Sequence, residues 1–339
     1  MFIYIAIFIV LIWSSFLKRK VAGKNIYILY VLLLSIIVGF RAKDVGTDTA
    51  SYIAYYFSSP EYMEMGWNKM VLLARMADLS PYFFNWIVAF VSLFFIAYVI
   101  AKEVPNSIYG LYFFYAMGFY FLMFNGMRQL LAVAIVFFAL YCLQQKKNKE
   151  FVLIVLLASL IHTSSLYVLP LVFINKLNVN MRRLVVSIIL SLLVGAVLNE
   201  DMFISLAGKY AHDVTEESKW GGFRESLGVV YVLLIIQNIF LLFLYRNSSA
   251  ELKTSFWMKI FIVSMILSNI LIRLTLGPRL IYFFATSQVI LFTCYQRRRL
   301  LNWACIAYSF VNFMRYLLPE LVEREGSLIP YQMHFEIFS

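Results

Sequence analysis

Long apolar stretches follow one another along almost the whole chain, and they limit the folds that it can adopt. A membrane-spanning helix needs about 20 mostly apolar residues. Because 63% of the 339 residues are hydrophobic and only 14% are charged, a water-soluble fold could not bury the apolar surface, which excludes a soluble enzyme. We expect an all-α polytopic membrane protein, built as a single domain over 1–339. Its full spans are predicted near 1–17, 25–41, 82–100, 108–124, 127–143, 184–199, 228–245, 256–275, 279–296 and 300–318.

The stretch 147–176 is either one long span or two short ones that fold back at a polar cluster, 162–165. Lys and Arg in short loops favour the cytoplasmic side of a membrane. If loop 18–25 is cytoplasmic, folding back places the three consecutive arginines 297–299 on the same side, whereas a single crossing places them outside. The charges therefore favour a short folded-back helix pair. This gives twelve crossings and puts both termini outside.

Two predicted outer segments are long, at 42–81 and 200–227. The first contains Trp67, Val71, Leu72, Arg75 and Leu79 at helical spacing, which predicts an amphipathic helix over about 66–79 that lies on the bilayer. The second is rich in acidic residues and glycine, and it is predicted to be a loop or a lid. Neither segment is large enough to form a separate domain.

Five cationic or imidazole side chains lie in or beside apolar stretches, where such groups are costly and are functional candidates by default. The topology does not depend on them, yet it places all five at or near the outer face. Guanidinium groups offer a planar fork of donors that matches phosphate oxygens, so several at one depth suit a pyrophosphate held at the membrane surface. The five residues are Arg41, Arg128, His162, Arg273 and Arg279.

Two carboxylates follow the second predicted span. Asp44 and Asp48 share a face if this stretch is helical, while Gly46 and Thr47 are equally consistent with a tight turn or a helix start. A carboxylate near a sugar hydroxyl can act as a general base. Two carboxylates without a third ligand are a weak metal signal, and the three cysteines have no paired spacing, so we expect neither a metal nor a cofactor. The formal net charge of +11 comes from loops between spans, so we expect no nucleic-acid partner.

Structural roles remain open for each candidate. The position of Arg128 fits a structural cation at a helix end as well as it fits a ligand. The position of Arg279 also fits a residue that only begins a helix at the membrane interface. A lone His such as His162 in an apolar segment is more often structural. Asp44 and Asp48 could cap a helix or pair with neighbouring cations.

Several short motifs occur in a fixed order. A span ends in Arg and is followed by Gly-Thr-Asp-Thr and Tyr, at Arg41, Gly46, Thr47, Asp48, Thr49 and Tyr52. An Asn-Gly-x-Arg-Gln helix start follows, at Asn125, Gly126, Arg128 and Gln129. A basic loop then leads to an Ala…His-x-Ser segment, at Lys146, Lys147, Lys149, Ala158, His162 and Ser164. A late Arg with Tyr three residues on, and an Ile-Pro-Tyr, complete the set, at Arg279, Tyr282, Ile329, Pro330 and Tyr331.

In order and spacing these motifs resemble the EpsG-type, Wzy-like bacterial polysaccharide polymerases, and the resemblance covers nearly the whole chain. It implies a glycosyltransferase of the bacterial inner membrane that joins repeat units carried on undecaprenyl diphosphate, at the outer face, to make O-antigen or exopolysaccharide. Donor and acceptor glycans, the lipid bilayer and a chain-length regulator are the implied partners.

The resemblance also implies roles for the candidates. His162 or Asp48 would take the proton of the acceptor hydroxyl, with His162 preferred. The cations that would neutralise the pyrophosphate leaving group are Arg128, Arg273 and Arg279. The residues that would bind the substrate are Arg41, Asp44, Thr47, Tyr52, Gln129 and Tyr282.

Two other classes of protein fit the same pattern less well. A flippase or transporter of lipid-linked oligosaccharides also has many crossings, but such proteins often show internal repeats and polar groups at mid-depth. This chain has no fixed repeat, and its polar groups gather at one face. A membrane O-acyltransferase could use His and Arg similarly.

Overall fold

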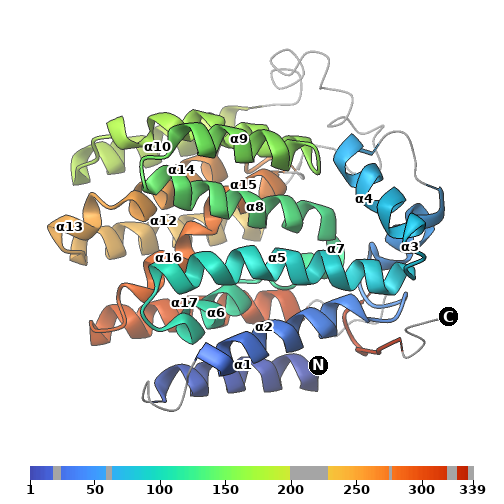
Figure 1. Ribbon diagram of the computed structural model, residues 1–339. Coiled ribbons are helices and arrows are strands. Elements are labelled where there is room, and N and C mark those ends of the chain that lie inside the picture. The colour runs from blue at the N-terminus through green and yellow to red at the C-terminus, as the bar shows by residue number, and fades with distance from the viewer. Residues whose placement is uncertain (18–23, 59–62, 199–227, 275–276, 319–326, 335–339) are drawn as a thin grey trace. The chain divides into compact units, whose positions relative to one another are not determined.

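The computed structural model of the chain is all-helical (Figure 1). It describes residues 1–17, 24–58, 63–198, 228–274, 277–318 and 327–334. Within these residues there is no named strand, only an isolated bridge between Arg41 and Met333. The predicted lid at 200–227 lies outside the described residues. The chain divides into two compact units, one formed by Met1–Leu169 with Val289–Ser339 and the other by Pro170–Gln288.

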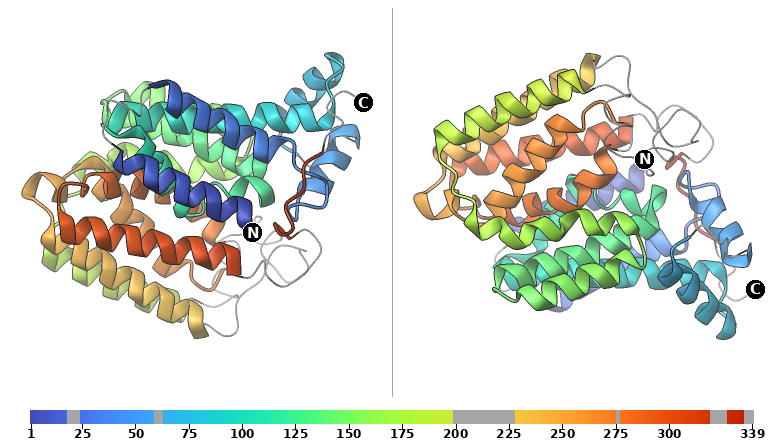
Figure 2. Two further views of the ribbon diagram at one scale, coloured as in Figure 1. Left: turned by 90° about the horizontal axis from the view of Figure 1, so that it is seen from below. Right: turned by 90° about the horizontal axis from the view of Figure 1, so that it is seen from above.

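The first unit is organised around two buried helices, α6 and α8. α5 packs against α2 on one side and α8 on the other, α8 packs against α9, and α1 and α17 both contact α6 (Figure 2). Local signals set the helix ends: the Ser80 hydroxyl accepts a hydrogen bond from the Phe83 amide directly before Pro81. The helices of this unit are α1 Phe2–Phe16, α2 Lys24–Gly39, α3 Thr49–Ser58, α4 Met65–Met76, α5 Pro81–Glu103, α6 Ser107–Ala116, α7 Leu122–Asn125, α8 Met127–Gln144, α9 Asn148–Ser159 and α17 Arg299–Leu317.

Two predicted spans are interrupted. In the first, 108–124, α6 ends at Ala116, because Gly118 has φ +90° and a Cβ on it would lie 1.9 Å from the Tyr316 ring. In the second, 279–296, α15 Gly277–Ala285 is separated from α16 Ser287–Thr293. The stretch 147–176 also forms two helices, α9 and the 3₁₀ helix η1 Thr163–Lys176, with a break at 160–162.

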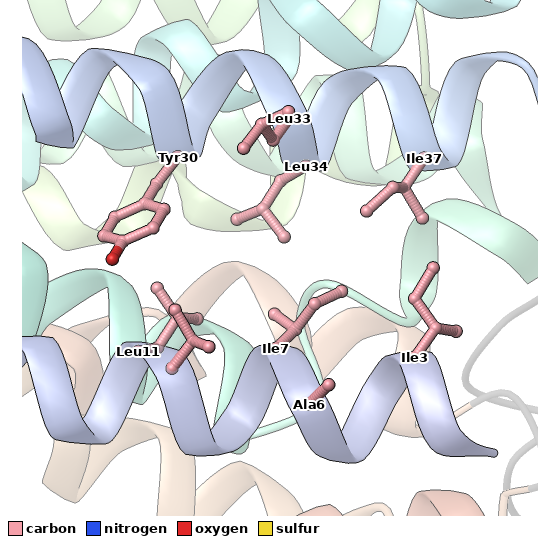
Figure 3. Close-up of a pocket in the computed structure, with 9 residues that line it drawn as sticks. Ile3, Ala6, Ile7, Leu11, Tyr30, Leu33, Leu34 and Ile37 are labelled. Atoms are coloured by element: carbon pink, nitrogen blue, oxygen red, sulfur yellow. The ribbon is translucent and has the colours of Figure 1, made fainter.

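An apolar groove runs between α1 and α2 (Figure 3). Its volume is about 230 Å³. A hydrogen bond of 2.6 Å joins the hydroxyls of Ser14 and Tyr30, and Tyr30 also lines the groove. Apolar residues of both helices line it: Ile3, Ala6, Ile7, Val10, Leu11, Leu33, Leu34 and Ile37.

A buried polar network joins three helices of the second unit. The Asn269 amide donates to the Ser191 hydroxyl at 2.8 Å and exchanges hydrogen bonds with the Asn238 amide at 2.7 and 3.1 Å. α10 approaches α14 closely, since a Cβ on Gly195 would lie 1.9 Å from the Asn269 carbonyl oxygen. Polar side chains and small residues are the usual means of joining helices in a membrane. The helices of this unit are α10 Met181–Val197, α12 Gly228–Asn247, α13 Ala250–Lys253, α14 Phe256–Ile270 and α15.

Three helices in the described part of the chain are long and apolar enough to cross a membrane: Pro81–Glu103, Met127–Gln144 and Val230–Asn247. Three shorter helices, Phe2–Phe16, Asn25–Gly39 and Phe256–Ile270, are also apolar. These helices support a membrane protein. The ten full spans, the twelve crossings and the single domain stay predictions.

Replacing Asn269 with Ala should lower the unfolding midpoint of the protein in lipid nanodiscs, because the variant leaves Asn238 and Ser191 without their shared partner. Such hydrogen bonds contribute about 0.6 to 2 kcal/mol each. Ser268→Ala is the matched control, since among the described residues the Ser268 hydroxyl bonds only to the Ser264 carbonyl of its own helix. Equal midpoints for the two variants would contradict the role of the network.

Candidate functional site

The side chain of Arg41 is completely buried just after α2. Its Nε donates to the Thr49 hydroxyl at 2.7 Å, Nη1 to the Val38 carbonyl at 2.5 Å and Nη2 to the Met123 carbonyl at 3.3 Å. The guanidinium also lies 5.2 Å from the centre of the Phe124 ring. Arg41 therefore joins the end of α2 to the start of α3 and to the segment before α8.

The Gly-Thr motif after Arg41 contacts the Asn-Gly motif that precedes α8. Gly46 has φ +89°, and a Cβ there would lie 2.5 Å from the Phe124 carbonyl oxygen, so this turn requires glycine. The next residue, Thr47, donates its amide to Asn125 Oδ1 at 2.9 Å. Two motifs that are 78 residues apart in sequence thus lie side by side.

Tyr52 of α3 links this turn to the first residues of α8. Its hydroxyl accepts a hydrogen bond from the Arg128 amide at 3.3 Å, and its ring lies 5.7 Å from that of Trp67. Burial raises the pKa of the Tyr52 hydroxyl above its ordinary value; the Arg128 guanidinium opposes the rise and the Asp48 carboxylate adds to it. Tyr52 is therefore a neutral phenol at neutral pH, and Asp48 and Arg128 both act on it.

Helix α4 lies over an apolar cluster that supports the site. Trp67, Val71 and Ala74 are its buried face, and they pack with Phe84 of α5 and Met127 of α8. The opposite face exposes several apolar side chains, among them Leu72, Leu73 and Met76. The amphipathic helix predicted over about 66–79 is thus present but ends at Met76, before Leu79, and its contact with the bilayer stays a prediction.

The start of α4 is fixed against the end of α9. The Gly66 amide donates to the Leu160 carbonyl at 2.8 Å, and a Cβ on Gly66 would lie 2.5 Å from the same oxygen. Position 66 therefore has no space for a side chain. This contact places Glu64, two residues earlier, beside the break between α9 and η1.

The Glu64 carboxylate contacts three groups from two other segments. Oε1 lies 3.2 Å from His162 Nδ1 and accepts a hydrogen bond of 3.0 Å from the Thr163 amide. Oε2 forms an ion pair with Arg128 Nη1. Glu64 precedes α4 but makes no side-chain hydrogen bond to that helix; it caps the start of η1 instead.

These contacts keep Glu64 ionised. Burial by itself would raise the pKa of the carboxyl, but the hydrogen bond with His162, the charge of Arg128 and the Thr163 amide together lower it to about 2. Glu64 is therefore a carboxylate over the whole physiological range of pH. It can accept hydrogen bonds but cannot donate one.

Arg128 and His162 still have groups available to a ligand. Their side chains are 21% and 19% exposed, against 14% for Glu64. In the part of the chain that the structure describes, His162 Nε2 has no hydrogen-bond partner, and only Nη1 of the Arg128 guanidinium has one. The cluster thus presents a ring nitrogen and several N–H donors at the protein surface.

The other predicted residues of the first unit differ in how deeply they are buried. Asp44 and Thr47 are exposed, Asp48 is half-buried and Gln129 is buried. The Thr47 hydroxyl donates to Asp48 Oδ1 at 3.1 Å. The structure thus brings Asp48, Tyr52 and Arg128 together, and their roles toward a substrate stay predictions.

The remaining predicted residues belong to the second unit. Arg273 Nη2 donates to the Ala196 carbonyl at 3.2 Å, and its buried Nε has no hydrogen-bond partner among the described residues. Arg279 is exposed near the start of α15, and Tyr282 lies one turn later in the same helix. Convergence of these residues with Arg128 stays a prediction.

Nothing in the sequence pattern marks Glu64 as a site residue. It is one of many acids in the predicted outer segments, and no motif includes it. Two signals could have identified Glu64. Arg128 and His162 need an anion where they meet, and Glu64 lies directly before α4. Among the described residues no group of three or more His, Cys, Asp or Glu side chains is placed to hold a metal ion.

Comparison with known proteins gives one family. The model of the EpsG family matches residues 24–333, which is most of the chain. No curated protein and no solved structure matches the chain.

Replacing Gly66 with Ala should lower the unfolding midpoint and displace Glu64, because the new methyl group meets the Leu160 carbonyl. The displacement can be measured with a double-mutant cycle. Gly66→Ala should lower the midpoint less in a Glu64→Gln background than in the unsubstituted protein, because both changes disturb the same contacts of Glu64. Lys69→Ala, on the exposed side of α4, is the control and should leave the midpoint close to that of the unsubstituted protein. Full additivity of Gly66→Ala with Glu64→Gln would count against the coupling.

The ion pair also predicts a dependence of stability on pH. The pKa of Glu64 falls from 4.5 to about 2 on folding, so the stability that it contributes is fully present above about pH 4.5 and is lost as the pH falls through about 2. The difference in unfolding midpoint between the unsubstituted protein and Glu64→Gln should be constant from neutral pH to about 5 and shrink in stronger acid. A difference that grows in acid would show that the sign is wrong.

Proposed function

The chain belongs to the EpsG family of Wzy-like polysaccharide polymerases, and we propose that it joins lipid-linked oligosaccharide repeat units into a surface polysaccharide. The observation that carries the proposal is the cluster in which Glu64 holds Arg128 and His162 together, because it combines an ionised anchor, a cation and a ring nitrogen open to a ligand. We place the reaction at the outer face of the bacterial inner membrane, with undecaprenyl diphosphate as the carrier.

The reaction is a substitution at an anomeric carbon. The acceptor is a hydroxyl of one lipid-linked repeat unit, and the donor is a glycan attached through its anomeric carbon to the lipid diphosphate. The acceptor oxygen forms a bond to that carbon, the bond from the carbon to the diphosphate oxygen breaks, and the lipid diphosphate leaves with the electron pair. The acceptor proton passes to a base on the protein.

Two residues of the cluster fit these needs. His162 Nε2 is the base, since it has no other partner among the described residues and lies on a partly exposed side chain. Arg128 binds the diphosphate through the N–H groups that Glu64 does not use, and its charge stabilises the leaving group. A guanidinium supplies this charge without a metal ion.

Asp48 is the alternative base. Its carboxylate already accepts a hydrogen bond from the Thr47 hydroxyl and lies close enough to Tyr52 to act on the pKa of its phenol. These contacts suit a carboxylate that binds a sugar hydroxyl better than one that accepts a proton. We therefore assign Asp48, with Thr47, Tyr52 and Asp44, to binding of the glycan.

The remaining candidates keep the roles implied by the family. Arg273, Arg279 and Tyr282 are proposed ligands of the lipid diphosphate, while Gln129 and Arg41 shape the substrate pocket from inside the protein. The exposed apolar face of α4, with Leu72, Leu73 and Met76, supports a position of this helix on the membrane surface. No cofactor enters this scheme, and a chain-length regulator is a proposed partner.

The experiment that tests the proposal supplies lipid-linked repeat units to the protein in nanodiscs and measures polymer length. His162→Ala should lower the rate by about 10² to 10⁴, the usual contribution of a general base. Arg128→Ala should lower it by about 10² to 10³, and Arg128→Lys should restore part of the loss because the charge returns without the planar fork. Arg75→Ala, on an exposed arginine of α4, is the control and should stay active.

Full-length polymer from both alanine variants would refute these roles. Deletion of the gene separates the proposal from a flippase. Loss of a polymerase leaves single repeat units on the outer side of the membrane, whereas loss of a flippase traps lipid-linked units on the inner side.

A further inference from the structure

Glu64 contacts both groups of the cluster with one carboxylate, and each oxygen has a separate task. Oε2 binds Arg128, while Oε1 faces both His162 Nδ1 and the Thr163 amide. The Thr163 amide is a fixed donor at the start of η1, so it holds Oε1 in place independently of the imidazole. The orientation of the carboxylate is therefore set from both sides.

The protonation state of the imidazole follows from that of its partner. An ionised carboxylate has no hydrogen to donate, so a hydrogen bond at 3.2 Å requires the proton to be on His162 Nδ1. In a neutral ring the other nitrogen, Nε2, then carries a lone pair. A free imidazole in water favours the opposite tautomer, in which Nε2 is protonated and cannot act as a base.

From these contacts we propose that Glu64 is a positioning residue, which keeps the proton of His162 on Nδ1 so that Nε2 can accept a proton, and which holds the Arg128 guanidinium at the same site. The proposal rests on the proposed function, and Glu64 lies outside the motifs of this chain that resemble the family. Glu64 itself touches no reacting atom.

The same contact has a second effect during the reaction. When Nε2 takes the acceptor proton, His162 becomes an imidazolium with protons on both nitrogens. The Glu64 carboxylate stabilises this cation through the existing bond to Nδ1, as the buried acid of a catalytic triad stabilises its histidine. The bond to Arg128 remains in place, because the guanidinium has further N–H groups for the diphosphate.

The first test observes the tautomer directly. The chain has three histidines, so a protein with His212→Gln and His334→Gln retains His162 alone. In ¹⁵N-labelled protein in nanodiscs at about pH 8, solid-state NMR should show Nδ1 protonated and Nε2 bare. A proton on Nε2 instead would overturn the proposal, whether or not any variant of Glu64 folds.

The second test removes first the charge of the carboxylate and then the whole side chain. Glu64→Gln keeps a carbonyl oxygen for His162 and Thr163 but loses the charge opposite Arg128, whereas Glu64→Ala loses both. We expect Glu64→Gln to lower kcat by about 10- to 100-fold and to alter the KM for the lipid-linked donor, because the neutral amide neither stabilises the imidazolium nor balances the charge of Arg128. We expect Glu64→Ala to lose the tautomer preference and lower kcat by about 10- to 100-fold, as for other residues that orient a histidine.

Asp78→Asn is the matched control. Asp78 is an exposed acid of the same outer segment with φ 54°, a conformation that Asn tolerates. It should leave both the NMR signals and kcat unchanged. A Glu64→Ala protein with normal kcat and an unchanged tautomer would refute the positioning role.

The two proposals fail in different ways. If the unsubstituted protein does not lengthen lipid-linked repeat units, the proposed function is wrong and the NMR result still decides the tautomer. If His162→Ala abolishes polymer synthesis while Glu64→Ala does not, the function stands and the role of Glu64 is wrong.

Discussion

The candidate site depends on one carboxylate that balances a cation and orients an imidazole. Without Glu64, Arg128 would lack its ion-pair partner and His162 Nδ1 its hydrogen-bond partner at the break between α9 and η1. Each of these losses carries a cost for partly buried polar groups. One side chain meets both needs because the Gly66 amide fixes the start of α4 against Leu160.

Other contacts support the site, because short polar segments meet one another beside an apolar cluster. Arg41, the Gly46–Thr47 turn and Tyr52 connect the end of α2 and helix α3 to the residues that precede or begin α8. Below them, Trp67, Phe84 and other apolar side chains form the cluster on which α4 rests. The polar groups thus lie on packed helices or directly beside their ends, which suits a site that must orient two large substrates.

Much of this could be predicted from the sequence, and the reasons differ by residue. Arg128 and His162 stood out because a cation or an imidazole in an apolar stretch is costly, and the family resemblance is confirmed by the match over 24–333. Glu64 could not be found in this way, since an acid in a polar segment carries no such cost. The end of α6 before Gly118 was missed for another reason: the hydropathy of 108–124 is continuous, and the need for glycine at 118 comes partly from Tyr316, some 200 residues further along the chain. Hydropathy alone has no information about such distant contacts.

Arg41 shows that the shape of a side chain can matter more than its charge. Its donors reach Thr49, Val38 and Met123 in different directions, and no carboxylate is its partner among the described residues. An isocharged lysine would bring a single ammonium group to the same place and could not span three separate acceptors. The position therefore requires a branched side chain that connects three segments, and a library of variants that preserves only formal charge would not reproduce it.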